Sequence, residues 1–220
     1  MNPMTVLRDA LYFAQRNLGQ IVMLCLPLII LETIITHMVS SASGPDAPVG
    51  YDLLVGLLVY PLYTSALILF LDARSRGETP RNSDLLARAL TLWPNFALLS
   101  AISTLAIVLG LSLLVLPGIF MTIVFAFAEY RLVLHGEGPL AALKSSILMS
   151  RGHFWQIFTC VAAVLAPLML LKELTFSAFP KDENLLLSLT LDSLYSFLQL
   201  FLTIVVFRLF MLISESSDAK

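Results

Sequence analysis

The sequence predicts an all-α polytopic membrane protein, and three observations carry that prediction. Of its 220 residues, 58% are hydrophobic and only 13% are charged, whereas a soluble domain has about 25% charged residues. Apolar runs long enough to cross a bilayer recur along the chain. Lys and Arg are concentrated in alternate connections between these runs. Too little polar surface remains to cover a globule in water, so lipid must be the solvent for most of the chain.

The N-terminal part predicts a surface helix followed by a first span. Residues 1–18 mix apolar and charged side chains, as in a helix that lies at the membrane surface. Residues 21–39 are long enough for a helix of about 30 Å, which matches the hydrocarbon thickness. We interpret this segment as an uncleaved helix and not as a signal peptide, because its apolar core is long and is interrupted by Glu32 and His37.

A long uncharged run in the middle of the chain must contain a turn. Residues 93–128 carry no charged side chain, and one helix of that length would measure about 54 Å, nearly twice the hydrocarbon thickness. Pro117-Gly118 is the predicted turn, because proline removes a backbone donor and glycine tolerates unusual dihedral angles. A full turn and a re-entrant break both remain open. The six predicted spans are therefore residues 21–39, 53–71, 95–116, 119–134, 154–171 and 185–213.

These spans are predicted to form one integral membrane domain over residues 1–220, with a weak internal repeat. Gly77-Glu78-Thr79-Pro80 and Gly136-Glu137-Gly138-Pro139 each precede an amphipathic stretch that leads into an aromatic-flanked span. One interpretation is three two-span units, each preceded by a short amphipathic cytoplasmic helix; the other is a chance match.

The positive charges predict the orientation. Six spans put both termini on one side, and with few exceptions the Lys and Arg side chains fall on that side. The cations there are Arg8, Arg16, Arg74, Arg76, Arg81, Arg88, Arg131, Lys144, Arg151, Arg208 and Lys220. The opposite side holds Lys172 and Lys181. Because cytoplasmic connections carry the excess of Lys and Arg, both termini are predicted to face the cytoplasm.

Glu32 is the most informative ionisable group within a span. A charge at that depth is costly, so it marks a functional hypothesis. Glu32, with His37 one and a half turns away, is either a proton- or cation-coupled site or a residue near the outer interface. In the second case it is protonated or paired with Lys172 or a hydroxyl.

Three further charges lie near the inner ends of predicted spans. We interpret Glu129 and Arg131 either as an ion pair that stabilises the fold or as an arginine that reaches toward the headgroups, with a proton relay as the less favoured alternative. Arg208 lies about five residues inside the end of the last span, and we expect its long side chain to reach toward the lipid headgroups.

The cationic connections have two interpretations of equal weight. They either set the topology alone or bind anionic lipid headgroups, with about 1 kcal/mol available for each well-placed cation. The candidate headgroup contacts are Arg74, Arg76, Arg81, Lys144 and Arg151.

No pattern in the sequence points to catalysis, a metal or a cofactor. Ser145, Ser146 and Ser150 have no His or Asp partner at catalytic spacing. Cys25 and Cys160 lie in apolar runs without a second ligand nearby, and the His residues follow no metal-binding pattern. A net charge of −2 gives no indication of the basic surface that binds nucleic acid. We therefore expect a protein that is not an enzyme and needs no cofactor.

The residues also resemble a known family. The chain is similar to the YciC-type family of bacterial inner-membrane proteins, and more loosely to the membrane domain attached to some glycerophosphodiester phosphodiesterases. The segments that carry the resemblance are Leu-Pro-Gly-Ile at 116–119, Ala-Leu-Lys-Ser-Ser at 142–146 followed by Arg151, Val-Leu-Arg-Asp at 6–9, and Phe-Arg-Leu-Phe-Met-Leu-Ile at 207–213. The resemblance implies a multi-pass protein of the bacterial inner membrane and assigns no activity.

Three functions compete at this stage. The leading prediction is a non-enzymatic inner-membrane protein with an envelope role that binds lipid, a partner membrane protein or a second copy of itself. The second is a small transporter or permease that uses Glu32 and helices kinked at Pro27, Pro61 and Pro167. A membrane-embedded enzyme that modifies lipids is the least favoured, because no acid–base or metal group is present.

Overall fold

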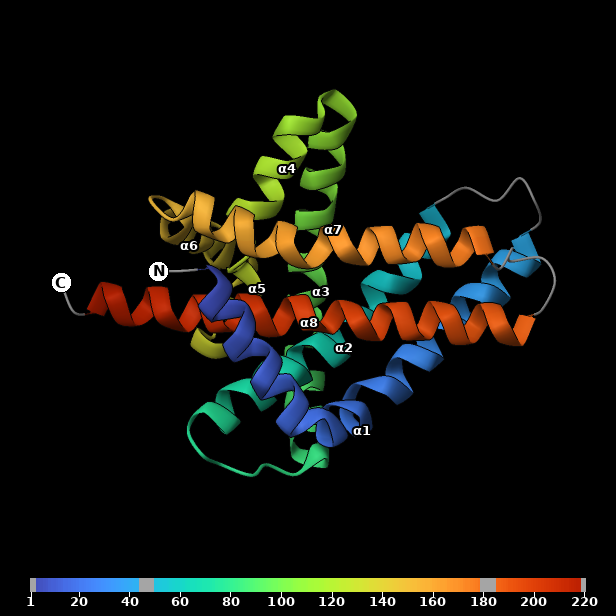
Figure 1. Ribbon diagram of the computed structural model, residues 1–220, viewed down its shortest axis with the longest axis horizontal. Helices are drawn as coiled ribbons and strands as arrows, with labels where there is room; N and C mark the ends of the chain where they lie inside the picture. Colours follow the sequence, from blue (N-terminus) through green and yellow to red (C-terminus); the bar gives the residue numbers. More distant parts are fainter. Residues whose placement is uncertain (1–2, 44–49, 179–184, 219–220) are drawn as a thin grey trace.

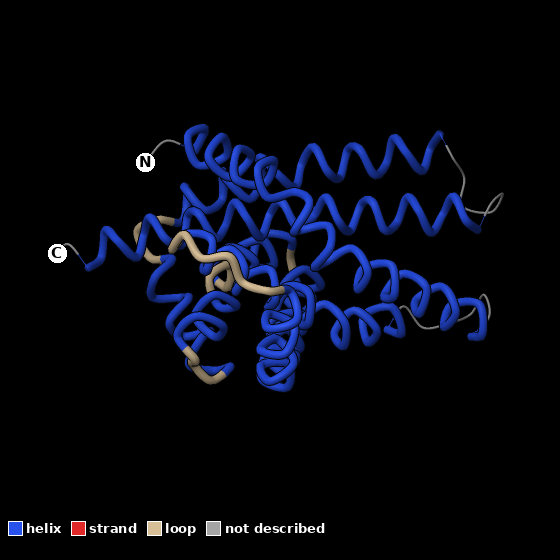
Figure 2. The backbone as a smooth tube through the Cα atoms, turned by 90° about the horizontal axis from the view of Figure 1, so that it is seen from below, coloured by secondary structure: helices blue, strands red, loops and turns tan. Residues whose placement is uncertain are grey.

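The protein is built from α-helices alone in all the residues that the structure describes. The computed structural model describes residues 3–43, 50–178 and 185–218, and Figure 2 shows helices joined by short loops in these ranges. In chain order the helices are α1 (Pro3–Ser43), α2 (Gly50–Ser75), α3 (Asn82–Leu113), α4 (Val115–Val124), α5 (Ala128–His135), α6 (Pro139–Ser150), α7 (Phe154–Ala178) and α8 (Leu185–Asp218). The all-α class is therefore confirmed.

Six segments are long and apolar enough to cross a membrane, which agrees with the six predicted spans. They are Pro3–Ala42, Leu53–Ser75, Asn82–Leu113, Val115–His135, Phe154–Thr175 and Leu185–Ser216. The fourth combines α4 and α5. Each segment contains most of the corresponding predicted span and extends beyond it, because the helices continue into flanking polar residues.

α1 joins the predicted surface segment and the first predicted span. Residues 1–18 and 21–39 were expected as two successive elements, and α1 is a single helix of 41 residues. Only Gly19 between the two parts disfavours a helix, and a glycine costs only about 1 kcal/mol there. Figure 1 shows α1 bending partway along its length. Pro27 lies inside the helix, and an internal proline removes a backbone hydrogen bond, which is a usual cause of a bend.

The turn in the long uncharged run lies three residues before the predicted Pro117-Gly118. α3 ends at Leu113, and Leu114 has extended backbone angles (φ −160°, ψ 147°) before α4 begins. Proline is well placed in the first turn of a helix, where its missing N–H has no partner to lose. The result is a full reversal: α3 and α4 form a hairpin that points away from α7 and α8 (Figure 1).

Gly110 and Gly118 let the two arms of this hairpin approach closely. A Cβ added at Gly110 would lie 3.0 Å from the Gly118 Cα. A Cβ added at Gly118 would overlap the Leu111 side chain and lie 2.8 Å from the Leu111 backbone nitrogen. Small residues allow such close packing between helices in lipid. Gly118 therefore serves the helix crossing and not the turn.

Ser146 of α6 holds the break between α4 and α5. Its hydroxyl is fully buried, donates a hydrogen bond to the Val124 carbonyl at 2.6 Å and accepts one from the Phe127 N–H at 3.1 Å. Ser150 donates a second, longer bond to the Val124 carbonyl at 3.3 Å. Backbone groups left free by a broken helix must find partners inside a membrane. These serines therefore have a structural role.

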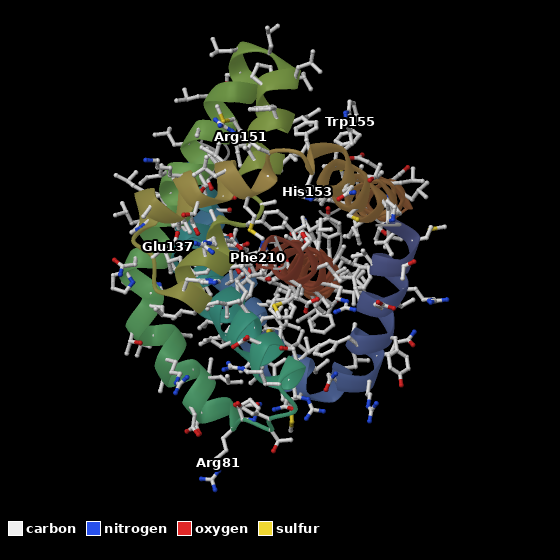
Figure 3. The ribbon with its side chains drawn as sticks, turned by 90° about the vertical axis from the view of Figure 1, so that its left-hand side faces the viewer. Arg81, Glu137, Arg151, His153, Trp155 and Phe210 are labelled. Atoms are coloured by element: carbon white, nitrogen blue, oxygen red, sulfur yellow. The ribbon has the colours of Figure 1, made fainter. Side chains whose placement is uncertain are left out.

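The core lies around the second half of α8, the half that is predicted to be nearer the cytoplasm. Phe210 is at the centre of the bundle when the molecule is seen along α8 (Figure 3), and its ring centroid lies 5.5 Å from that of Tyr130 and 5.8 Å from that of Phe127. The Tyr130 hydroxyl donates to the Thr203 carbonyl at 2.8 Å. These contacts fix α5 against α8.

The start of α1, the end of α8 and α6 lie at one end of the molecule, whereas the end of α7 and the start of α8 lie at the other (Figure 1). Within each of the pairs α1–α2, α3–α4 and α7–α8 the helices pack on each other. This packing is compatible with three two-span units, and the internal repeat stays a prediction. Lys181 and Lys220, which were used to predict the orientation, lie outside the described residues.

Candidate functional site

Polar side chains line two large cavities of the molecule. The first, here named the cationic cavity, has a volume of about 700 Å³ and lies between α1, the end of α2 and the last third of α8. Its charged and amide side chains are Asp9, Arg16, Asn17, Arg74, Arg76, Arg208 and Glu215. Four arginines and two carboxylates give this lining a net positive charge.

Contacts within the cationic cavity hold two of its arginines in place. Asn17 is nearly buried, and its side-chain oxygen accepts a hydrogen bond from the Arg74 Nε at 3.0 Å. Arg208 lies 3.4 Å from the Asp9 carboxylate, which joins α8 to α1. Arg76 pairs with Asp72 one turn earlier on α2. The exposed Arg16 reaches the same cavity from α1.

An apolar groove of about 440 Å³ adjoins the cationic cavity. It runs between α1, α7 and α8, and Ile204 lines both spaces. Apart from Gln15 its lining is apolar, with Leu11 and Leu18 from α1, Pro167 from α7 and Phe201 from α8 among the side chains. A charged cavity suits a lipid headgroup, and an adjoining apolar groove suits an acyl chain.

The second space, here named the intramembrane cavity, has a volume of about 720 Å³ and lies among candidate spans. α1, α2, α3, α5, α7 and α8 all contribute to it. Its polar lining residues are Glu32, Tyr60, Tyr63, Ser100, Ser103, Thr104, Glu129, Lys172, Ser196 and Gln199. Two carboxylates that are 97 residues apart in the chain thus share one cavity.

Each carboxylate of the intramembrane cavity has a tyrosine beside it. The Tyr60 hydroxyl donates to Glu129 Oε1 at 2.9 Å, and Tyr63 lies beside Glu32 in the cavity lining. Gly56 faces Glu32 closely, because a Cβ added there would lie 3.5 Å from Glu32 Oε1. α2 therefore presents both phenols to the two acids from adjacent turns.

Glu129 and Arg131 do not form the predicted ion pair. Arg131 pairs with Glu137, while Glu129 faces Tyr60. The reason is local: α5 ends at His135, and Gly136 has a left-handed backbone (φ 66°) that turns the chain back. This turn brings Glu137 over Arg131 and leaves Glu129 free to face the intramembrane cavity.

His37 does not join Glu32. Its Nε2 lies 3.9 Å from the Asp192 carboxylate and 3.3 Å from the Ser188 hydroxyl, both on α8. Glu32 instead faces α2, so the two side chains of α1 serve different neighbours. His37 joins α1 to the first half of α8.

The predicted headgroup contacts divide into two groups. Arg74 and Arg76 line the cationic cavity, whereas Arg81, Lys144 and Arg151 do not. Arg81 projects away from the molecule in Figure 3, and Arg151 lies where α6 ends. Arg208, which was expected to reach toward headgroups, lines the cationic cavity.

Several residues of the two cavities were not among the sequence candidates. Arg16 was counted for topology alone. Ser100 and Thr104 lie in the uncharged run 93–128, yet both line the intramembrane cavity. Tyr60 and Tyr63 carried a usable signal, since residues three apart share a helix face and a buried phenol needs a hydrogen-bond partner.

The charged side chains of these two cavities can bind charged ligands. Among the described residues, no group of three or more His, Cys, Asp or Glu side chains is placed so that it could hold a metal ion. With six candidate spans and two polar cavities between them, the molecule is an α-helical polytopic membrane protein.

The chain belongs to an uncharacterised protein family, UPF0259, whose family model matches residues 51–212. The match begins at α2 and ends in α8, so it includes all helices except α1 and most residues of both cavities. No solved structure matches the chain.

Proposed function

We propose that this protein is a non-enzymatic component of the bacterial inner membrane that binds an anionic phospholipid, with an envelope role and both termini in the cytoplasm. One observation carries the proposal: four arginines line a cavity of about 700 Å³ that meets an apolar groove at Ile204. The resemblance to YciC-type proteins supports the choice of membrane. A partner membrane protein or a second copy of the chain is the other class of ligand for this face.

The chemistry of the two spaces fits a phospholipid. Guanidinium groups bind phosphate oxygens through paired N–H donors, and Arg74 is already oriented by Asn17. Arg16 and Arg76 are exposed and face the same cavity. The adjoining groove is apolar and suits an acyl chain. The proposal therefore places the phosphate among the arginines and one chain between α1, α7 and α8.

Replacing cavity arginines should weaken lipid binding selectively. The double variant Arg16→Gln/Arg76→Gln should bind phosphatidylglycerol about 30-fold more weakly, since each cation contributes about 1 kcal/mol. Both side chains are exposed, so the fold should persist. The measurement is native mass spectrometry of the purified protein titrated with phosphatidylglycerol, with phosphatidylcholine as the neutral comparison.

The matched control is Arg81→Gln/Arg88→Gln, which removes two exposed arginines outside the cationic cavity. It should leave the affinity for phosphatidylglycerol near the wild-type value. If both double variants lost the same affinity for phosphatidylglycerol, the effect would come from the net charge alone. That result would refute a lipid site at the cationic cavity.

A second candidate function, a small transporter, is favoured by the intramembrane cavity. Glu32 and Glu129 share this space with hydroxyl groups and Lys172, and ionisable groups at this depth often form ion or proton pathways. Pro27, Pro61 and Pro167 lie inside α1, α2 and α7, where helices can bend.

The transport hypothesis predicts that Glu32→Gln abolishes flux and leaves phosphatidylglycerol binding unchanged. Glutamine keeps the size and hydrogen-bonding oxygen of glutamate and removes its charge. The measurement is proton entry into proteoliposomes under an imposed membrane potential, followed with an entrapped pH-sensitive dye. If wild-type protein and protein-free liposomes show the same rate, proton-coupled transport is refuted.

A further inference from the structure

Acidic side chains outnumber basic ones in the lining of the intramembrane cavity. Its ionisable lining consists of the carboxyl groups of Glu32 and Glu129 and the ammonium group of Lys172, which leaves one formal negative charge when all three are ionised. A charge among membrane spans is costly unless a partner neutralises it. One monovalent cation would balance this lining.

The carboxylates of Glu32 and Glu129 can each accept further hydrogen bonds. A carboxylate offers about four acceptor positions. The Tyr60 hydroxyl donates one hydrogen bond that the two oxygens of Glu129 share, with Oε1 at 2.9 Å and Oε2 at 3.2 Å. Glu32 lies beside Tyr63 in the same cavity. An additional donor in the cavity can therefore reach either acid without displacing a tyrosine.

Ser100 gives an independent sign of a missing ligand. The residue is only 6% exposed and lines the intramembrane cavity, and its hydroxyl has no hydrogen-bond partner. Buried polar groups are nearly always satisfied, so each exception calls for a partner. The cavity beside it is the space that such a partner would occupy.

The aromatic lining narrows the chemistry of that ligand. The rings of Tyr60 and Tyr63 are 5.6 Å apart and packed edge to face at 82°, and both border the cavity near the acids. Aromatic faces next to carboxylates are the recognition chemistry of ammonium groups. A hydrated metal ion would gain little from the rings.

We propose that the intramembrane cavity binds an organic ammonium group between Glu32 and Glu129. The N–H groups of a primary ammonium would donate to the two carboxylates and to Ser100, and its carbon atoms would contact the tyrosine rings. Binding of this ligand does not require its transport across the membrane. The proposed site is also separate from the lipid site at the cationic cavity.

Calorimetric titration of the full-length protein in detergent tests the site, with butylammonium as the probe and butanol as its neutral counterpart. Wild-type protein should bind butylammonium and should not bind butanol. Glu32→Gln and Glu129→Gln should each weaken butylammonium binding about tenfold, the loss of one charge-assisted bond. The control Glu173→Gln removes an exposed carboxylate of α7 outside the cavity and should bind as wild type does.

Gly56→Val tests the same site without removing a charge. Its methyl groups would occupy space beside the Glu32 carboxylate, and butylammonium binding should fall while both acids remain. Wild-type affinity in Gly56→Val, equal binding of butylammonium and butanol, or equal affinity in Glu129→Gln and Glu173→Gln would each overturn the proposal.

Nanodiscs distinguish the two sources of an ammonium group. If the natural ligand is a lipid headgroup, phosphatidylethanolamine in the disc should compete and raise the apparent Kd for butylammonium relative to discs of phosphatidylglycerol alone. If the natural ligand is a soluble amine, the two discs should give the same Kd. Either result supports ammonium recognition and names its source.

Discussion

Gly118→Ala should destabilise the protein by about 2 kcal/mol, and Gly118→Leu by about 3 kcal/mol or more. The physical reason is the crossing of α3 and α4. Even one methyl group at this position overlaps the Leu111 side chain and lies 2.8 Å from the Leu111 backbone nitrogen. A backbone atom cannot turn aside as a side chain can, so the hairpin must open. The measurement is the free energy of unfolding in detergent, from denaturant titration followed by circular dichroism.

Gly19→Ala is the matched control for this prediction. Gly19 also lies within a helix, and a Cβ added there meets nothing within 4 Å. Alanine should therefore stabilise α1 by about 0.5–1 kcal/mol through its higher helix propensity. Gly110→Ala should resemble Gly118→Ala, since its Cβ would lie 3.0 Å from the Gly118 backbone. A Gly118→Ala variant as stable as Gly19→Ala would contradict the close crossing.

The sequence was sufficient for the number and approximate position of the spans, because hydropathy and bilayer thickness constrain them directly. It was not sufficient for the turn at Leu114. Pro117 and Gly118 are typical turn residues, and the same two residues suit the first turn and the tight crossing of a helix. Hydropathy does not distinguish these uses, since the whole run from 93 to 128 is uncharged.

Single residues of the candidate site could be predicted from the sequence, but the cavity that they form together could not. Glu32 and Glu129 were recognised because charge is rare within spans. That they share one cavity depends on how α1, α2 and α5 pack, and no local spacing encodes it. The predicted ion pair between Glu129 and Arg131 was wrong for a related reason, because residues two apart in a helix do not face each other. The left-handed backbone of Gly136 turns the chain so that Glu137 pairs with Arg131 instead.

The position of Glu129 depends in turn on Ser146, which leads to the second large effect. Ser146→Val keeps the approximate shape of the side chain and removes its hydroxyl. The Phe127 N–H then loses its partner, and the Val124 carbonyl keeps only the longer bond from Ser150. Each unsatisfied buried group costs about 1–3 kcal/mol, so we expect the free energy of unfolding to fall by about 3 kcal/mol.

Ser145→Val is the control, because Ser145 is adjacent on α6 and only partly buried; it should change stability by less than about 0.5 kcal/mol. The two variants should also differ in ligand binding. α5 begins one residue after Phe127 and carries Glu129, so a loosened break should disturb the bond from Tyr60 and weaken butylammonium binding in Ser146→Val alone. Equal stability of the two valine variants would show that α6 does not hold the α4–α5 break, and Glu129 would then need another anchor.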